Sequence, residues 1–162
     1  MHTFSAPKTH AVAAEVAARS GLKPSACTDT TLHQLARLVR RRYDVELGKV
    51  GLRTTQYGLL TEVAANGPMR PCDLADAMAL SPSTLTRNLK PLISSGLLEL
   101  GPGTDGRTRS VKITASGRSK CAEGLLHWTA AQARVHQLIG SRNVSTLRAL
   151  VEDCLASMSA SA

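Results

Sequence analysis

Aromatic side chains are scarce in this chain, whose 162 residues include one Trp, two Tyr and one Phe. Proteins that bind single-stranded nucleic acid commonly stack bases on several aromatic rings, and four rings are too few for such a platform. The scarcity therefore argues against single-strand binding. Apolar residues still make up 43% of the chain, and together with the 12 glycines they reach the share of an ordinary globular protein, which excludes a disordered or collagen-like class.

Long apolar runs are lacking as well. No stretch approaches the roughly 18 apolar residues of a membrane-spanning helix. The alanine-rich segment 11–18 contains Glu15 and has no clear charged lead-in, so it does not resemble a signal peptide. We therefore expect a cytoplasmic protein.

The cysteines show no paired spacing of the kind that holds zinc or builds a disulfide scaffold. They are Cys27, Cys72, Cys121 and Cys154. We expect reduced thiols, with Cys72 and Cys154 serving in packing. His127 and His136 are nine positions apart, which does not place them on one helical face, so we predict no metal site and no cofactor.

Charge is plentiful and mostly of one sign. The chain has 20 Lys and Arg against 12 Asp and Glu, a formal net charge of +8. Seven basic and two acidic side chains lie between positions 81 and 120. Such a concentration indicates an anionic partner, and with so few aromatics the best candidate is duplex DNA.

Helical periodicity dominates the chain after a loosely attached arm over 1–26. After the arm, apolar residues recur at helical spacing in six segments, one of which is short. Glycine or proline separates most of these segments. The predicted helices span 29–47, 54–65, 71–79, 82–95, 114–139 and 144–157.

A tight turn separates the third and fourth of these helices. Ser81 followed by Pro82 is a typical N-cap and first residue of a helix, and Gly96 is a typical residue just beyond a helix end. On the fourth helix, leucine and isoleucine cover one side. The opposite side carries Ser83, Arg87 and Lys90, with Thr84 and Thr86 at its edges. This arrangement predicts a helix-turn-helix with a polar and basic outer face.

A β-hairpin is predicted directly after it, with strands over 97–100 and 107–113 around a glycine-rich loop. Strict alternation places Val111 and Ile113 on one face of the second strand. The other face then carries Thr108, Ser110 and Lys112. A hairpin behind a helix-turn-helix is a wing, so the predicted fold class is mainly α with a two-stranded β-wing.

An ordered set of short motifs resembles the MarR family of winged helix-turn-helix regulators over about residues 28–158. The matching segments are 56–60, 73–75, 83–92, 96–98 with Asp105 and Arg107, and 111–117. The resemblance implies a homodimer. Residues 27–53 and 114–162 would form its helical dimerisation region, and residues 54–113 its DNA-binding domain. Gly106 stands where the family often has arginine, so one wing charge is missing.

The outer helix face and the wing together form the candidate DNA-binding site. Arg87 suits a bidentate contact with guanine. Arg107 suits the narrow minor groove, where the negative potential is strongest. In the family pattern the wing aspartate, here Asp105, holds an arginine in place. An ordinary solvated helix face and charged hairpin are the alternative explanation. The candidates are Ser81, Ser83, Thr84, Thr86, Arg87, Lys90, Asp105, Arg107 and Arg109.

The resemblance also implies a small-molecule effector, held between the dimerisation helices and the DNA-binding domain. Guanidinium groups suit the carboxylate of an organic acid, and a phenol is the other candidate. Packing or salt bridges within the dimer explain the same residues equally well. The candidate effector contacts are His33, Arg37, Arg40, Gln56 and Tyr57.

Two alternatives remain open at this point. Some family members sense peroxide through a cysteine near the start of the first helix, which would assign Cys27, with Cys121 as its partner. A protein-binding module without DNA specificity is the other alternative. The sequence contains no catalytic set of nucleophile, base and orienting residue, no phosphate-binding loop and no metal spacing, so we do not expect an enzyme.

Overall fold

The computed structural model describes residues 27–103 and 108–160. The predicted arm over 1–26 and the predicted wing residues Asp105 and Arg107 lie outside this part. The described chain divides between Val39 and Arg40 into two compact units.

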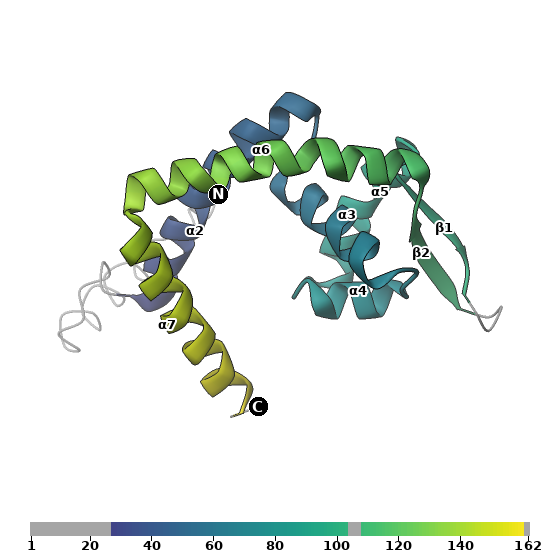
Figure 1. The fold of residues 1–162 in the computed structure, drawn as a ribbon. Helices are drawn as coiled ribbons and strands as arrows, with labels where there is room; N and C mark the ends of the chain where they lie inside the picture. The colour runs from purple at the N-terminus through teal and green to yellow at the C-terminus, as the bar shows by residue number, and fades with distance from the viewer. Residues whose placement is uncertain (1–26, 104–107, 161–162) are drawn as a thin grey trace, which may run out of the picture. The chain divides into compact units, whose positions relative to one another are not determined.

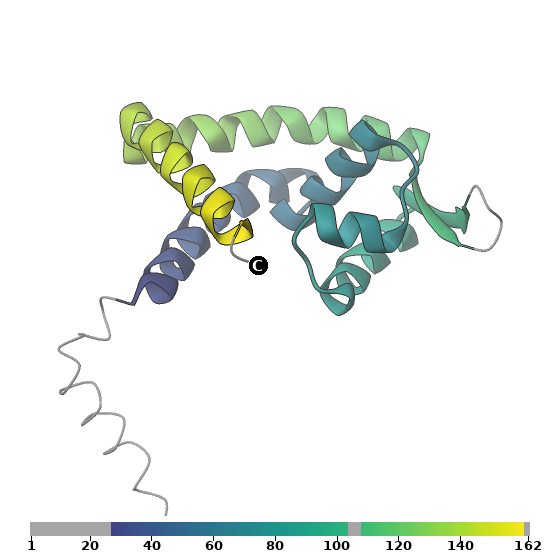
Figure 2. The same ribbon diagram turned by 90° about the horizontal axis from the view of Figure 1, so that it is seen from below.

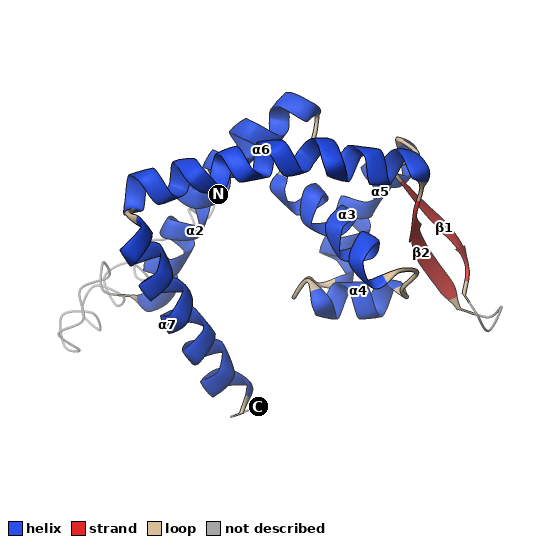
Figure 3. Ribbon diagram, viewed as in Figure 1, coloured by secondary structure: helices blue, strands red, loops and turns tan. Residues whose placement is uncertain are grey.

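The predicted helices are present in the expected order (Figures 1 and 3). The short helix α4 ends at Ala77 rather than Ala79, and α7 begins three residues earlier than expected. The helices are α2 (Thr28–Leu47), the 3₁₀ turn η2 (Gly48–Val50), α3 (Thr54–Asn66), α4 (Pro71–Ala77), α5 (Pro82–Ser94), α6 (Ala115–Ile139) and α7 (Ser141–Ser159).

The wing is an antiparallel hairpin of β1 (Leu98–Pro102) and β2 (Arg109–Ile113), which projects from helices α3–α5 in Figure 2. Ser110, predicted on the polar face of β2, is buried, with only 5% of its surface exposed. Met69 pairs with Val111 on the side of β2 away from β1. Strand β2 therefore has backbone partners on both of its edges, from β1 and from Met69.

The core lies between α3, α4, α5 and the hairpin. Its largest fully buried side chains belong to these elements and to the end of α2. They are Leu47, Leu59, Leu60, Val63, Leu74, Leu92, Leu98 and Val111. Both α5 and the wing are therefore anchored on one apolar cluster, which holds them in a defined relation to each other.

Helix α7 contrasts with this core, because none of its 19 residues is buried within the chain. Large apolar side chains lie exposed along it, including Leu150 at 57% and Leu155 at 60% exposure. On α2 the single buried residue is Leu47. No helix in the described ranges is both long and apolar enough to span a membrane.

Candidate nucleic-acid interface

The turn between α4 and α5 has helix-turn-helix geometry and was placed correctly by the sequence. Ala79 has a positive φ of 49°, an uncommon conformation for a residue with a Cβ. The turn is closed by backbone hydrogen bonds from the N–H of Ala79 to Asp76 O and from the N–H of Leu80 to Ala75 O. Only the folded turn reveals the role of Ala79, since glycine would have been the usual signal for this conformation.

The start of α5 is capped as predicted. The Ser81 Oγ accepts a hydrogen bond from the Thr84 N–H at 3.3 Å, and Pro82 is the first helical residue. Ser81 also exchanges hydroxyl hydrogen bonds with Ser83 and Thr84, at 3.2 and 2.8 Å. These hydroxyl groups form one cluster at the exposed N-terminal end of the helix.

The two faces of α5 differ sharply, as predicted. Leu85, Leu89 and Leu92 are buried in the core. Ser83, Arg87 and Lys90 are exposed. Within residues 27–103 and 108–160, neither Arg87 nor Lys90 forms an ion pair. Their charges are thus available to an external anion.

Thr86 contributes less freely to this face. Its hydroxyl donates to the carbonyl oxygen of Pro82 at 2.9 Å, so its proton is used within the helix. Asn88 was not among the predicted site residues, and its amide is engaged at both ends. Its Nδ2 donates to Thr84 O, and its Oδ1 accepts from the Thr55 hydroxyl of α3.

The wing places Arg109 at its exposed outer end, opposite Pro102 in the hairpin register. Arg70, at the start of α4, forms a two-point ion pair with Asp73, with both nitrogen–oxygen distances at 2.7 Å. That pair holds the pKa of the Asp73 carboxyl below its usual value. Basic groups therefore stand near the hairpin as well as on α5.

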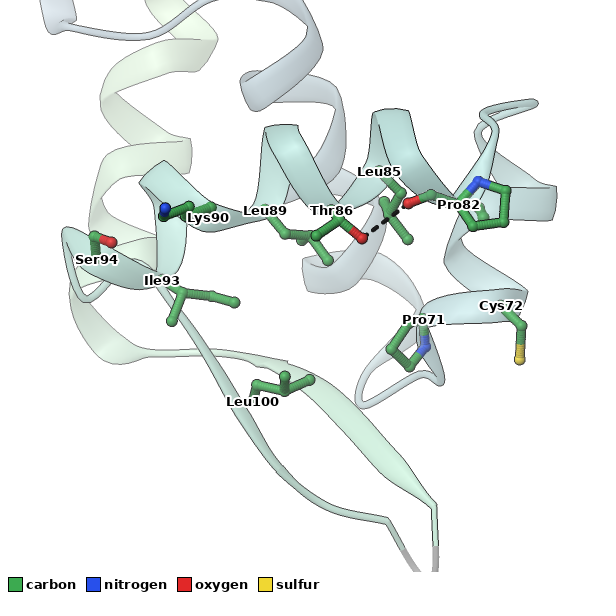
Figure 4. A pocket seen from close by; sticks show the side chains of 11 residues that line it. Pro71, Cys72, Pro82, Leu85, Thr86, Leu89, Lys90, Ile93, Ser94 and Leu100 are labelled. Atoms are coloured by element: carbon green, nitrogen blue, oxygen red, sulfur yellow. Dashed lines mark hydrogen bonds between the residues drawn. The ribbon is translucent and has the colours of Figure 1, made fainter.

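An apolar cavity of about 440 Å³ opens beside α5 (Figure 4). Its wall combines leucine and isoleucine side chains of α5 with Leu100 of β1 and Pro71 of α4. Thr86, Lys90, Ser94 and Cys72 add four polar groups. No sequence pattern signals this cavity, because its walls come from three separate elements.

The predicted effector residues occupy different environments. His33 and Arg37 belong to the unit that ends at Val39, and Arg40 is exposed in the second unit. The Oε1 of Gln56 accepts the Arg53 N–H at 2.9 Å. Tyr57 is 7% exposed, and burial raises the pKa of its hydroxyl.

The four cysteines are free thiols in differing surroundings. Cys27 is exposed at the start of α2, where the N–H and hydroxyl of Thr30 hold the pKa of its thiol below the usual value. Burial raises the pKa of the Cys121 thiol. The predictions that Cys72 and Cys154 are packing residues are wrong for the single chain, because both are exposed. Their positions near a helix start and on the exposed α7 explain this.

Among the described residues no group of three His, Cys, Asp or Glu side chains is placed to hold a metal ion. His127 instead approaches Glu46 at 3.9 Å, and His136 lies beside Gln132.

Comparison with known proteins places these features in context. The model of the MarR family matches residues 50–108. A Bacillus subtilis protein described as an uncharacterized HTH-type transcriptional regulator, YwoH, is 27% identical over 92 residues, which is 57% of this chain and 67% of that protein.

Solved structures of similar fold include regulators bound to DNA. A mutant MarR from E. coli complexed with operator DNA has a TM-score of 0.72 at 22% identity, covering 78% of this chain and 92% of that one. The M. tuberculosis regulator MosR in complex with DNA has a TM-score of 0.64 at 28% identity, covering 79% and 98% of the two chains.

Proposed function

Since the chain belongs to the MarR family, whose members are transcriptional regulators and not enzymes, we propose that it is a homodimeric repressor of a palindromic operator. The observation that carries this proposal is α5, which has one face buried in the core and one exposed face bearing Ser83, Arg87 and Lys90. The partner in this proposal is double-stranded chromosomal DNA, so the proposed location of the protein is the cytoplasm.

In this proposal the α5 helices of the two subunits enter successive major grooves, about 34 Å apart. Arg87 contacts a guanine through its paired N–H groups, and the hydroxyl groups at the start of α5 contact phosphates or bases. Arg109 and Arg107 of the wing follow the adjacent minor groove, and Asp105 orders the wing. Relatives with solved DNA complexes support this mode of binding.

The homodimer is supported by the exposure of α7. A helix of 19 residues without one buried residue gains little packing within its own chain, and helices in proteins owe most of their stability to tertiary packing. Large apolar side chains on α6 and α7 remain exposed, including Leu126 at 74% and Met158 at 74%. A second copy of the chain would cover them, which makes 27–53 and 114–162 the dimerisation region.

The effector in this proposal is a small organic acid or a phenol that binds the DNA-incompetent dimer more tightly and so releases the operator by linkage. Two locations are candidates. One is the predicted set on α2 and α3, centred on Arg37 and Arg40. The other is the apolar cavity beside α5, where Leu89 and Ile93 suit a ring and the Lys90 ammonium suits a carboxylate.

Two variants distinguish these locations. Ile93→Trp fills the cavity and should abolish effector-dependent release if the ligand binds beside α5. Arg37→Ala with Arg40→Ala should abolish it if the ligand binds at α2. The measurement is release of a fluorescent operator by a panel of aromatic acids and phenols. Unchanged release in both variants would exclude both locations.

A thiol switch is the second candidate function, and the low pKa of the Cys27 thiol favours it. In this case peroxide oxidises Cys27 and weakens operator binding, with Cys121 as the proposed partner thiol. Normal peroxide-dependent release by Cys27→Ser would rule this function out.

The first experiment on DNA binding is selection of duplexes from a random pool by the purified chain, followed by fluorescence anisotropy at two salt concentrations. We expect a palindromic consensus bound by one dimer, with an affinity that falls steeply with salt, roughly one log unit per log unit for each phosphate contact. A folded dimer that enriches no duplex would instead favour a protein-binding module.

A further inference from the structure

Helix α3 lacks an effective cap of its own. Its N-cap residue is Arg53, whose guanidinium has only hydrogen-bond donors and accepts nothing from the first turn. Gln56 supplies the reverse half of a capping pair by accepting the Arg53 N–H. The first N–H groups of α3 therefore need acceptors from elsewhere in the molecule.

Asp44 of α2 provides one of them. Its Oδ1 accepts hydrogen bonds from the Thr54 N–H at 2.8 Å and from the Thr54 hydroxyl at 2.6 Å. The carboxylate also lies at the positive end of the α3 dipole. Asp44 and Thr54 are both half-buried, and thus the cap of α3 is a tertiary contact between two helices.

The first turn of α3 is also hydrogen-bonded to α5, the proposed recognition helix. The hydroxyl of Thr55 donates to the Asn88 Oδ1 at 3.4 Å, and the Asn88 Nδ2 donates to Thr84 O at 3.0 Å. Polar contacts thus join Asp44 on α2 to Thr54, and join the next residue of the α3 first turn, Thr55, through Asn88 to Thr84 on α5. Thr84 shares its hydroxyl hydrogen bond with the Ser81 cap.

We propose that Asp44 is a positioning residue for DNA recognition, which sets the orientation of α5 through Thr54, Thr55 and Asn88. This inference rests on the proposed function, since it requires α5 to contact DNA. Asp44 itself touches no DNA in this scheme. It ties the dimerisation region to the recognition helix, so a shift of α2 is passed to α5.

If only net charge mattered, an Asp44 substitution would strengthen DNA binding rather than weaken it. Removal of a carboxylate makes the chain more positive, and a more positive protein binds DNA more tightly. A positioning role predicts weaker binding. Asp76→Ala is the matched control, because it removes an exposed carboxylate from α4.

The test measures the affinity of each variant for the duplex that the wild-type chain selects from random DNA. We expect Asp44→Ala to bind about tenfold more weakly, a typical size for coupling between sites, and Asp76→Ala to bind as tightly as wild type or more tightly. Thr54→Ser keeps both contacts and should bind normally. Thr55→Val removes the hydroxyl with little change of shape, so it tests the same connection if Asp44→Ala does not fold.

A double-substitution cycle separates positioning from a general loss of stability. If Asp44 acts through Asn88, Asp44→Ala with Asn88→Ala should lose about as much affinity as the weaker-binding single variant. An affinity loss in the double variant equal to the product of the two single losses would overturn the inference. Wild-type affinity of both Asp44→Ala and Thr55→Val would also overturn it. A wild-type chain that selects no duplex would instead refute the proposed function, and the positioning role with it.

Discussion

The ring of Tyr57 on α3 lies directly against Gly124 on α6. A Cβ added at Gly124 would stand 2.7 Å from Cε2 of Tyr57 and 2.8 Å from its Cδ2. Real Cβ atoms are not found so close to ring carbons, so this contact requires glycine inside a long helix. Helices α3 and α6 are thereby held together at a position where a side chain would separate them.

Gly124→Ala should therefore destabilise the protein. Overpacking of a core costs roughly 1–3 kcal/mol, which exceeds the gain of about 1 kcal/mol from replacing a helical glycine with alanine. After this gain is subtracted, we expect the free energy of unfolding to fall by up to about 2 kcal/mol. Urea denaturation followed by circular dichroism measures this change.

Gly58→Ala is the matched control, because it too lies inside a helix. A Cβ added at Gly58 would stand 3.1 Å from the Met78 methyl carbon, which is the end of a flexible side chain that can move aside. We expect equal or higher stability, by up to about 1 kcal/mol. If Gly124→Ala behaved like Gly58→Ala, the contact with Tyr57 would not be as tight as the structure has it.

Arg87→Ala should weaken operator binding and relax base preference at one position of each half-site. The loss of a bidentate arginine–guanine contact costs about 1–3 kcal/mol. Anisotropy with duplexes substituted one base pair at a time measures both effects. Lys49→Ala removes the same charge from a residue paired with Glu46, and its base preferences should match those of the wild type.

Leu150→Glu combined with Leu155→Glu should convert the proposed homodimer to a monomer. Both side chains are more than half exposed in the single chain, and charges there would face the partner's apolar surface. We expect sedimentation velocity to show the monomer, with reduced helicity because α7 loses its packing. Ser145→Glu, on the side of α7 that faces the hollow beside α6, is the control and should remain dimeric.

Cys27 should react with thiol reagents at lower pH than Cys121. A lowered pKa means that Cys27 is already thiolate at a pH where the half-buried Cys121 is still protonated. Variants that each retain one of the two cysteines, with the other three replaced by serine, allow the pH dependence of alkylation to be measured separately. An alkylation midpoint of Cys27 at or above that of Cys121 would contradict the prediction.

Local sequence signals placed most of the secondary structure. Ser81 with Pro82, Gly96 and the leucines of α5 were sufficient to predict the helix-turn-helix and its exposed basic face, because each signal acts within one or two helical turns. The same reasoning did not predict that Ser110 is buried. Nor did it predict that Met69 pairs with Val111 on the outer edge of β2, because these residues are far apart in the sequence.

The sequence by itself determined the order of the helices, the position of the wing and the charged face that indicates DNA, since periodicity, caps and net charge are local or additive properties. Only the tertiary structure decided that Asp44 caps α3, that Tyr57 needs a glycine opposite it and that a cavity opens beside α5. Each of these depends on the distance between atoms of different elements. Such distances follow from the packing of the whole core, which no single segment encodes.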